Sequence, residues 1–175
     1  YGSEEIKKTL LPKLVSGEIV GTMAVTEDLY APTEDNIKLL CDNGLLNGKK
    51  IAVPDVGAAT HAIVVAKSNN GISLQVVDLS SNGVSIEHQE NIDESRGHFS
   101  ITFDNVNSDS IGDESSGWEM YESIINQAAV LFSYEQIGGS QAALDMAINY
   151  AKERYAFGRP IGSYQAIKHL SLIHI

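Results

Sequence analysis

The sequence is poor in cysteine and in basic residues. Its 175 residues include one cysteine, Cys41, which excludes an internal disulfide, a zinc site built from several cysteines and a CxxC redox pair. Lys and Arg together number 12 against 23 Asp and Glu, which gives a formal net charge of -11. Because proteins neutralise nucleic-acid phosphates with clustered Lys and Arg, this balance argues against a nucleic-acid binder.

Long apolar runs, metal motifs and a natural start are also missing. No apolar run approaches the roughly 20 residues of a membrane helix, since the longest candidate, Ile51 to Ala66, is interrupted by Pro54, Asp55 and His61. The five histidines form neither HExxH nor an i, i+4 pair, so no metal site is expected. The first residues, Tyr1 to Glu5, lack an initiator Met and the layout of a signal peptide. We therefore expect the chain to be cut from a longer protein at both ends.

The chain begins with a helical pattern. Ser3 precedes Glu4 and Glu5, which is the arrangement of an N-cap followed by acidic residues in the first turn. One apolar face follows at helical spacing, formed by Ile6, Leu10, Leu11 and Leu14. The pattern stops near Ser16-Gly17, because glycine commonly ends a helix.

From Glu18 to about Gly112 the pattern changes to short runs of strand character. The expected strands are Ile19 to Thr26, Lys50 to Val53, His61 to Ala66, Ile72 to Asp78, Val84 to Ile86 and Phe99 to Phe103. Asn-Gly pairs, which supply the positive φ of tight turns, separate these runs at 43–44, 47–48, 70–71 and 82–83. This stretch is predicted to form an antiparallel barrel or sandwich.

After Gly112 the periodicity is helical again. A continuous pattern from about Trp118 to Tyr155 predicts a helix roughly 55 Å long. In its middle, Gly138-Gly139-Ser140 indicates either a close approach by another helix or ligand, or a simple kink. The segment Phe157 to Pro160 ends this helix, and a second helix is predicted after Gly162-Ser163.

Three separated motifs resemble the acyl-CoA dehydrogenase family in their order and spacing. Tyr150 to Ile161, followed by Gln165 to His169, resembles the first helix-to-helix corner of the family's C-terminal domain. Met23 to Glu27 resembles its flavin-docking strand, and Leu46 to Ile51 resembles the lead-in to the next flavin-contacting strand. The resemblance covers residues 2 to about 170.

The resemblance implies an α+β multidomain fragment. Residues 1–17 would end an N-terminal helical domain, residues 18–112 would form the antiparallel β-barrel middle domain, and residues 113–175 would start a C-terminal helical bundle, truncated here. It further implies an FAD-dependent enzyme that oxidises an acyl-CoA thioester to the 2,3-enoyl form. An electron-transfer flavoprotein or similar acceptor, a homo- or hetero-oligomer and a cytoplasmic location are expected with it.

Four cofactor-binding residues follow from the matched motifs. In the family, the corner reaches across a subunit interface to the FAD bound mainly by the neighbour, and this places Arg154, Phe157 and Gln165 on that FAD. Arg154 offers a planar fork of donors suited to a pyrophosphate, Phe157 a flat apolar face and Gln165 an amide. Thr26 matches a threonine that meets the flavin ring. The alternatives are a surface arginine, a core phenylalanine, a surface glutamine and a structural threonine.

The departures from the family pattern are informative. Where the family has a glycine-rich turn that admits the pyrophosphate, this chain has the bulkier run 28–33. Where the family has an aromatic wall and a hydroxyl against the flavin, this chain has Ala52, Val53 and Pro54. In some branches the catalytic Glu lies at the position of Ala128, and in most it lies beyond residue 175. Glu135 is two turns from Ala128 and is not expected to act as the base, so no catalytic residue is assigned.

Three hypotheses follow. The chain belongs to an ordinary FAD-dependent acyl-CoA dehydrogenase, to a non-catalytic partner subunit of a heteromeric, steroid-type enzyme that completes another chain's FAD site, or to a structural fragment without activity. The run 170–175 departs from the family's pattern and resembles translated adapter sequence, so we expect it not to belong to the native helix.

Overall fold

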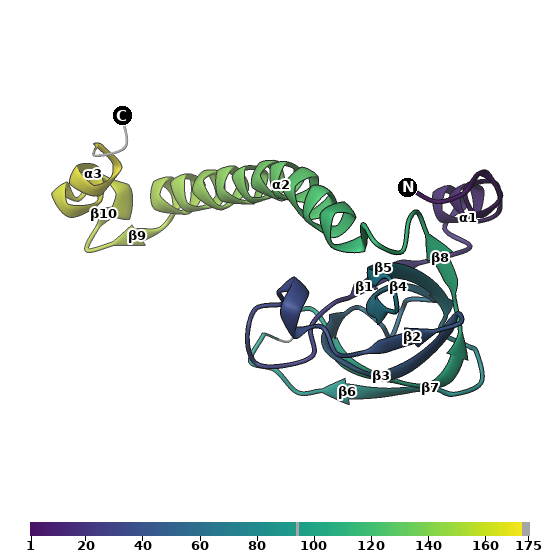
Figure 1. The fold of residues 1–175 in the computed structure, drawn as a ribbon. Helices are drawn as coiled ribbons and strands as arrows, with labels where there is room; N and C mark the ends of the chain where they lie inside the picture. The colour runs from purple at the N-terminus through teal and green to yellow at the C-terminus, as the bar shows by residue number, and fades with distance from the viewer. Residues whose placement is uncertain (94, 173–175) are drawn as a thin grey trace. The chain divides into compact units, whose positions relative to one another are not determined.

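A computed structural model describes residues 1–93 and 95–172. The chain divides into two compact units, Tyr1–Ile124 and Ile125–Ile175, and each is described by itself. Helix α2 begins in the first unit and continues into the second. The elements follow the expected order of helix, β region, long helix and second helix (Figure 1). The domain boundaries at residues 17 and 112 stay predictions.

Helix α1 (Glu4–Ser16) confirms the predicted caps. The Ser3 hydroxyl accepts a hydrogen bond from the Ile6 backbone N–H at 3.2 Å. Gly17 adopts the left-handed conformation with φ of 77°, and its N–H donates to the Leu14 carbonyl at 3.3 Å. The cap residues therefore define this helix, although Pro12 lies inside it.

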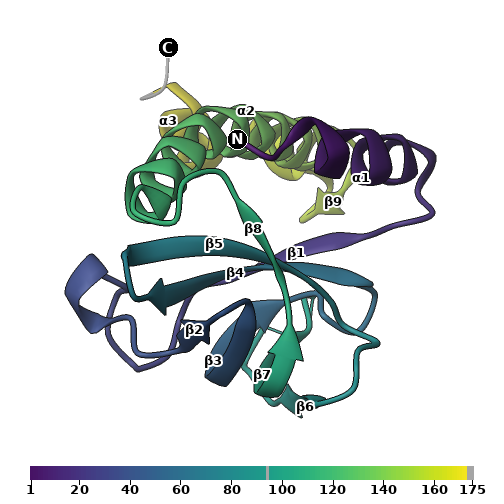
Figure 2. The same cartoon turned by 45° about the vertical axis from the view of Figure 1, so that its right-hand side comes forward.

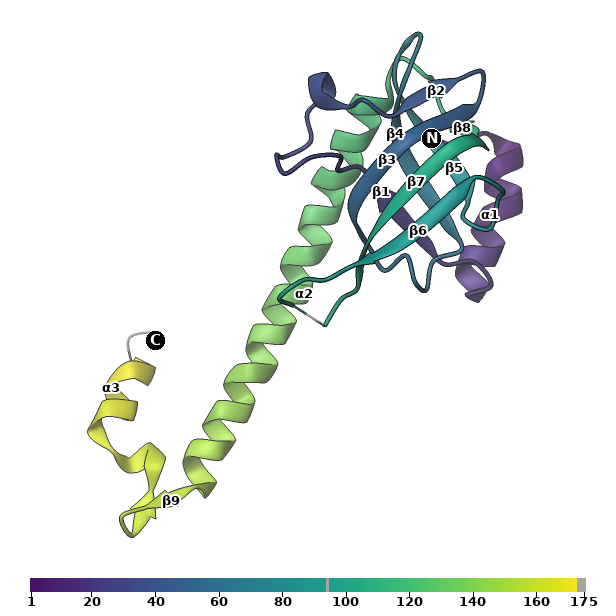
Figure 3. The ribbon, with the colours of Figure 1, turned by 90° about the horizontal axis from the view of Figure 1, so that it is seen from below.

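Among the described residues, eight strands form one sheet. They are β1 (Gly21–Ala24), β2 (Leu40–Asp42), β3 (Leu45–Pro54), β4 (His61–Ser68), β5 (Gly71–Asp78), β6 (Val84–Gln89), β7 (His98–Asn107) and β8 (Asp109–Ile111). The order is β6-β7-β3-β2-β4-β5-β8, with β1 paired to β4. Figure 2 shows β1, β4 and β5 side by side, and Figure 3 shows β3, β7 and β6.

The sheet differs from the prediction in direction and closure. β1 runs parallel to β4, with Gly21 opposite His61, and β2 meets β4 in parallel at Leu40 and Lys67. A wholly antiparallel sheet was therefore the wrong expectation at these two pairs, because the long connection between β1 and β4 permits parallel pairing. The hydrogen-bonded order ends at β6 and β8, and a closed barrel stays a prediction.

The Asn-Gly pairs have two different roles. Asn43 and Gly44, with φ of 49° and 78°, form the predicted tight turn between β2 and β3. Asn47-Gly48 lies instead inside β3 at a register shift, so the turn expected there is wrong. A Cβ at Gly48 would lie 3.1 Å from the Leu39 Cα, and this close approach is the reason for the glycine.

Two apolar clusters fill the first unit. One lies inside the sheet, where Leu46, Val64 and Ile101 are fully buried. The other packs the start of α2 against the sheet through Val65, Leu74 and Met120. Burial of these side chains is the main stabilising contribution in this unit.

The long helix α2 (Gly117–Glu153) confirms the predicted helix to within two residues at each end. A Cβ at Gly138 or Gly139 would meet nothing within 4 Å among the described residues, so no other part of the described chain approaches there. An approach by a helix of another chain or by a ligand stays a prediction. After α2 come β9 (Tyr155–Ala156), β10 (Arg159–Pro160), the 3-10 turn η2 (Ile161–Ser163) and α3 (Gln165–Leu172).

Helix α3 continues through Leu172. That the run 170–175 does not belong to the native helix stays a prediction, and residues 173–175 lie outside the described residues. No helix in the described ranges has the length and apolar character needed to cross a membrane.

Candidate functional site

The corner after α2 is a small hairpin that the sequence analysis missed. β9 and β10 pair with Arg159 opposite Ala156, and Phe157 and Gly158 form the two-residue turn with φ of 52° and 79°. Positive φ at both central residues is the geometry of the commonest hairpin turn. Gly158 is typical of such a turn, but Phe157 is not, because a bulky residue rarely adopts positive φ. The sequence therefore did not predict the hairpin.

Backbone hydrogen bonds fix Arg154 at the base of this hairpin. Its N–H donates to the Tyr150 carbonyl at 2.8 Å, which extends the last turn of α2. Its carbonyl accepts from the Ile161 N–H, also at 2.8 Å. Arg154 therefore stands where the helix ends and the returning strand begins, as the spacing predicted.

Three supporting residues of the corner were not predicted. The Arg159 guanidinium lies 3.9 Å from the centre of the Tyr164 ring, and the Tyr164 hydroxyl donates to the Ala156 carbonyl at 2.7 Å. A Cβ at Gly162 would lie 3.0 Å from the Ala151 carbonyl oxygen, so the chain passes close to α2 there. Tyr164 thus joins the hairpin to the start of α3, and η2 packs against the end of α2.

The corner presents the three predicted side chains to solvent. Phe157 is 98% exposed, so it is not a core residue within the described chain. Arg154 is exposed, and its guanidinium has no hydrogen-bond or ion-pair partner within residues 1–93 and 95–172. Gln165 is exposed as the first residue of α3, with its amide nitrogen 3.2 Å from the His169 Nε2. Arg154 stands directly before the hairpin, Phe157 in its turn and Gln165 at the start of α3, so the corner exposes a cation, a flat apolar ring and an amide.

Thr26 lies in the other unit. Strand β1 ends at Ala24, so the expected strand to Thr26 is two residues too long. The Thr26 carbonyl accepts a hydrogen bond from the Ile51 N–H at 2.8 Å. In the described part of the chain its hydroxyl makes no hydrogen bond, which leaves that group available to a ligand.

A buried ion pair next to Thr26 also escaped the sequence analysis. The Lys50 Nζ lies 2.6 Å from the Glu27 Oε1, and the two side chains are 0% and 9% exposed. Burial lowers the pKa of Lys50 to about 8, against the opposing effect of its hydrogen bond and charge attraction to Glu27. Both residues stood in the matched motifs, but they are 23 residues apart and only the sheet brings them together.

The loop after Glu27 stands where the resembled family has its pyrophosphate cradle. The Leu29 N–H donates to the Asp28 carboxylate at 2.7 Å, and the Thr33 N–H donates to the Asn36 amide oxygen at 2.8 Å. Leu29 and Tyr30 are 94% and 77% exposed. A phosphate cradle needs free backbone N–H groups and little negative charge. Because side chains of the loop occupy two of its amides and its acids would repel a phosphate, the loop does not fit this role.

Ala52, Val53 and Pro54, which replace the aromatic wall and hydroxyl of the family pattern, lie at a bulge in β3. Ala52 has φ of 50°, is exposed, and donates its N–H to the Gln89 side chain at 2.8 Å. Val53 is buried in the core, and the Pro54 carbonyl accepts from the Thr22 hydroxyl at 2.7 Å. Ala52 is therefore the only one of the three that is exposed, and it offers a methyl group instead of an aromatic wall.

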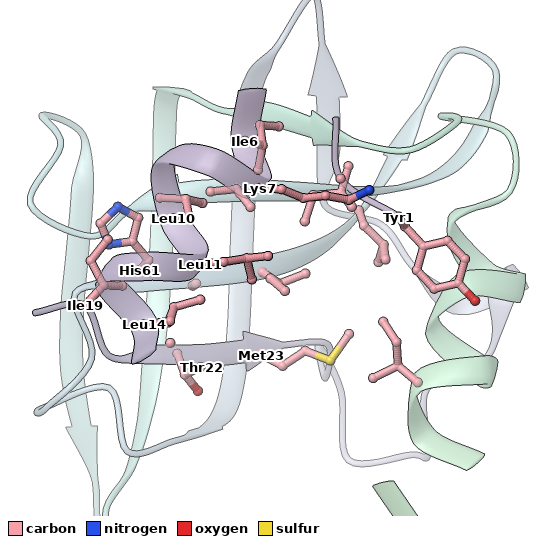
Figure 4. A pocket seen from close by; sticks show the side chains of 18 residues that line it. Tyr1, Ile6, Lys7, Leu10, Leu11, Leu14, Ile19, Thr22, Met23 and His61 are labelled. Carbon is pink, nitrogen blue, oxygen red and sulfur yellow. The ribbon is translucent and has the colours of Figure 1, made fainter. Parts of the chain in front are cut away.

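The first unit also contains an apolar cavity of about 560 Å³. It lies between α1 and the sheet, where Leu10, Leu14 and Met23 point into it in Figure 4. No carboxylate is among its described lining residues, whose titratable side chains are those of Tyr1, Lys7 and His61. Within the described ranges, no group of three or more His, Cys, Asp or Glu side chains is placed to hold a metal ion.

Comparison with known proteins gives a consistent result. The family model "Acyl-CoA dehydrogenase, C-terminal domain" matches residues 115–172. An acyl-CoA dehydrogenase of Bacillus subtilis (strain 168) is 30% identical over 181 residues, which cover 95% of this chain. This chain belongs to the acyl-CoA dehydrogenase family. The family match includes the whole corner, with Arg154, Phe157 and Gln165.

Other members of the family agree in sequence and fold. The human mitochondrial short-chain specific acyl-CoA dehydrogenase is 28% identical over 96% of the chain. The acyl-CoA dehydrogenase structure from Geobacillus kaustophilus superposes with a TM-score of 0.90 at 22% identity, covering 99% of this chain and 50% of that one. A glutaryl-coenzyme A dehydrogenase in complex with glutaryl-CoA has a TM-score of 0.89 at 26% identity, covering 98% of this chain and 48% of that one. This chain spans about half the length of the acyl-CoA dehydrogenases that it matches, with 48% of the Bacillus protein and 44% of the human protein covered.

Proposed function

We propose that this chain is part of an FAD-dependent acyl-CoA dehydrogenase that oxidises an acyl-CoA thioester to the 2,3-enoyl-CoA. The names of the relatives support the reaction class, and a structure 26% identical to this chain is an FAD complex of PigA. The observation that carries the proposal is the exposed guanidinium of Arg154, without a partner in the described chain, on a hairpin held by Tyr164 and Gly162.

In this proposal the described residues bind the cofactor and do not perform the chemistry. When bound, the flavin supplies a hydride acceptor. Arg154 donates to the pyrophosphate, Phe157 covers an apolar part of the FAD and Gln165 adds a hydrogen bond. The Thr26 hydroxyl would contact the flavin ring of an FAD bound by the first unit, whereas the corner would reach an FAD bound mainly by a neighbouring subunit. We assign the carboxylate base to none of the described residues, and an electron-transfer flavoprotein or a similar acceptor would reoxidise the cofactor.

A second candidate is a non-catalytic partner subunit that completes the FAD site of another chain in a heteromeric acyl-CoA dehydrogenase. The loop 28–36 favours it, because two of its amides are taken by its own side chains and Asp28, Glu34 and Asp35 carry negative charge. In this arrangement Arg154 and Gln165 would act on FAD held by the partner, while the β unit would hold none.

Flavin content distinguishes the two candidates. The full-length protein is purified alone and after co-expression with the product of its neighbouring gene, and FAD per complex is counted by absorbance after denaturation. One FAD per copy of this chain in a homo-oligomer supports the first candidate and contradicts the second. FAD only in the co-expressed complex, at one per partner chain, supports the second. The absence of FAD from both preparations contradicts both.

A further inference from the structure

The two ends of the loop 28–37 meet on one carboxylate. Glu27 stands directly before the loop, and its two side-chain oxygens accept hydrogen bonds from the N–H groups that follow the loop. The Lys38 N–H donates to Oε2 at 2.8 Å and the Leu39 N–H donates to Oε1 at 3.0 Å. The Glu27 side chain is 9% exposed; the bond from Leu39 is partly buried, whereas the bond from Lys38 is exposed. One side chain thus closes the loop.

Lys50 connects this closed loop to strand β3. Its Nζ donates to the Glu27 Oε1 at 2.6 Å and to the Val25 carbonyl at 2.9 Å. The neighbouring Ile51 N–H donates to the Thr26 carbonyl. Residues 25, 26 and 27 are therefore each bonded to residues 50–51, and the backbone of Thr26 has little freedom.

Burying the charges of Glu27 and Lys50 costs free energy, so the pair is not explained by stability alone. Replacing a buried ion pair with apolar side chains of similar volume is commonly neutral or stabilising, because the pair must lose its hydration. Lys50 is fully buried and makes only the two bonds already named in the described chain. The pair is thus better explained by the geometry it imposes on Val25, Thr26 and the loop than by a gain in stability.

We propose that Glu27 and Lys50 are positioning residues that hold Thr26 and both ends of the 28–37 loop in the geometry with which this unit meets the flavin. The proposal rests on the proposed function, because it takes Thr26 as a cofactor contact. Glu27 and Lys50 act through the backbone of Thr26 and touch no cofactor themselves.

The test uses the full-length protein in its FAD-binding assembly and four variants. Lys50→Met and Glu27→Gln each break the pair. The double variant removes both charges together, so it avoids an unpaired buried charge and remains folded where a single variant fails. Lys49→Met is the matched control, because Lys49 directly precedes Lys50 on β3 and, in the described chain, forms only an exposed pair with Glu87 at 3.4 Å.

Two quantities are measured for each variant. Amide hydrogen exchange reports the mobility of residues 25–39, with β5 as the internal reference for an intact fold. FAD affinity is measured by flavin fluorescence. We expect Lys50→Met and the double variant to raise exchange across 25–39 by about tenfold and to weaken FAD binding by about tenfold, with β5 unchanged. Lys49→Met should change neither quantity.

Each contrary result has a distinct meaning. Unchanged exchange at 25–39 in the double variant overturns the proposal, because the pair would not hold the loop. Raised exchange with unchanged FAD affinity also overturns it, because the pair would then be structural only. A wild-type assembly that binds no FAD contradicts the proposed function itself. If the wild type binds FAD and the variants bind it equally well, only the positioning role is contradicted.

Discussion

Arg159 lies over the face of Tyr164, with its guanidinium carbon 3.9 Å from the ring centre, while the Tyr164 hydroxyl bonds back to the Ala156 carbonyl at 2.7 Å. One aromatic side chain thereby contacts both strands of the hairpin that follows α2. Because the hairpin positions Arg154 and Phe157, the geometry of the candidate site depends on this contact.

Tyr164→Phe should loosen the corner while keeping the ring under Arg159. The lost hydrogen bond is worth about 1 kcal/mol, so amide exchange of residues 155–164 should rise roughly fivefold. Tyr155→Phe is the control, because Tyr155 is exposed and its hydroxyl has no hydrogen bond in the described ranges. Equal exchange in the two variants would show that the Tyr164 hydroxyl does not hold the hairpin.

The buried Lys50 should make stability depend on alkaline pH. Its pKa is about 8 in the folded chain against an ordinary 10.5. The unfolded chain therefore keeps this proton more strongly, and the contribution of Lys50 to stability rises as the pH increases from about 8 to about 10.5. Each unit of pKa difference corresponds to about 1.4 kcal/mol, so the gain relative to Lys50→Met is at most about 3 to 4 kcal/mol. Urea unfolding of both proteins across this range measures it, and a difference that shrinks as the pH rises would contradict the assignment.

Two glycines of α2 should respond in opposite directions to the same substitution. A Cβ at Gly117 would overlap the Ile72 carbonyl, so Gly117→Ala should destabilise the first unit by about 2 kcal/mol or more. A Cβ at Gly138 meets nothing within 4 Å in the described chain, and Gly138→Ala should stabilise the helix by up to about 1 kcal/mol. Thermal unfolding of the 175-residue chain measures both. A destabilising Gly138→Ala would contradict the open surroundings of that residue.

The 175-residue chain alone should bind no flavin. Its loop 28–36 has two amides engaged by its own side chains and carries negative charge, which disfavours a pyrophosphate. Purified protein should therefore lack the flavin absorbance bands after dialysis against FAD. Stoichiometric yellow protein would show that this loop, or another part of the chain, holds the cofactor by itself.

The sequence predicts the features that depend on neighbouring residues. Ser3 and Gly17 define α1 because caps are local, and the long apolar period defines α2 to within two residues. Features that depend on pairing between distant segments were missed. Glu27 and Lys50 meet only through the sheet, and the parallel pairing of β1 with β4 depends on a long connection.

In the candidate site, too, some features were predicted from the sequence and others were missed. The placement of Arg154 and Gln165 at the two sides of the corner follows from spacing, and the structure confirms it. The hairpin between them was not predicted, because its strands are two residues long and Phe157 occupies a position that usually takes Asn or Gly. The cofactor roles of Arg154, Phe157, Gln165 and Thr26 stay predictions.

The most direct test of the central claim is the FAD affinity of the assembled full-length protein with Arg154→Ala. Lys152→Ala is the matched control, because it removes an exposed positive charge two residues earlier in the same last turn of α2. Loss of a charge-assisted hydrogen bond to a phosphate costs about 1.5 to 3 kcal/mol, so Arg154→Ala should weaken FAD binding roughly tenfold to a hundredfold, while Lys152→Ala leaves it unchanged. Equal FAD affinity in wild type and Arg154→Ala would contradict the assignment of this corner to the flavin site.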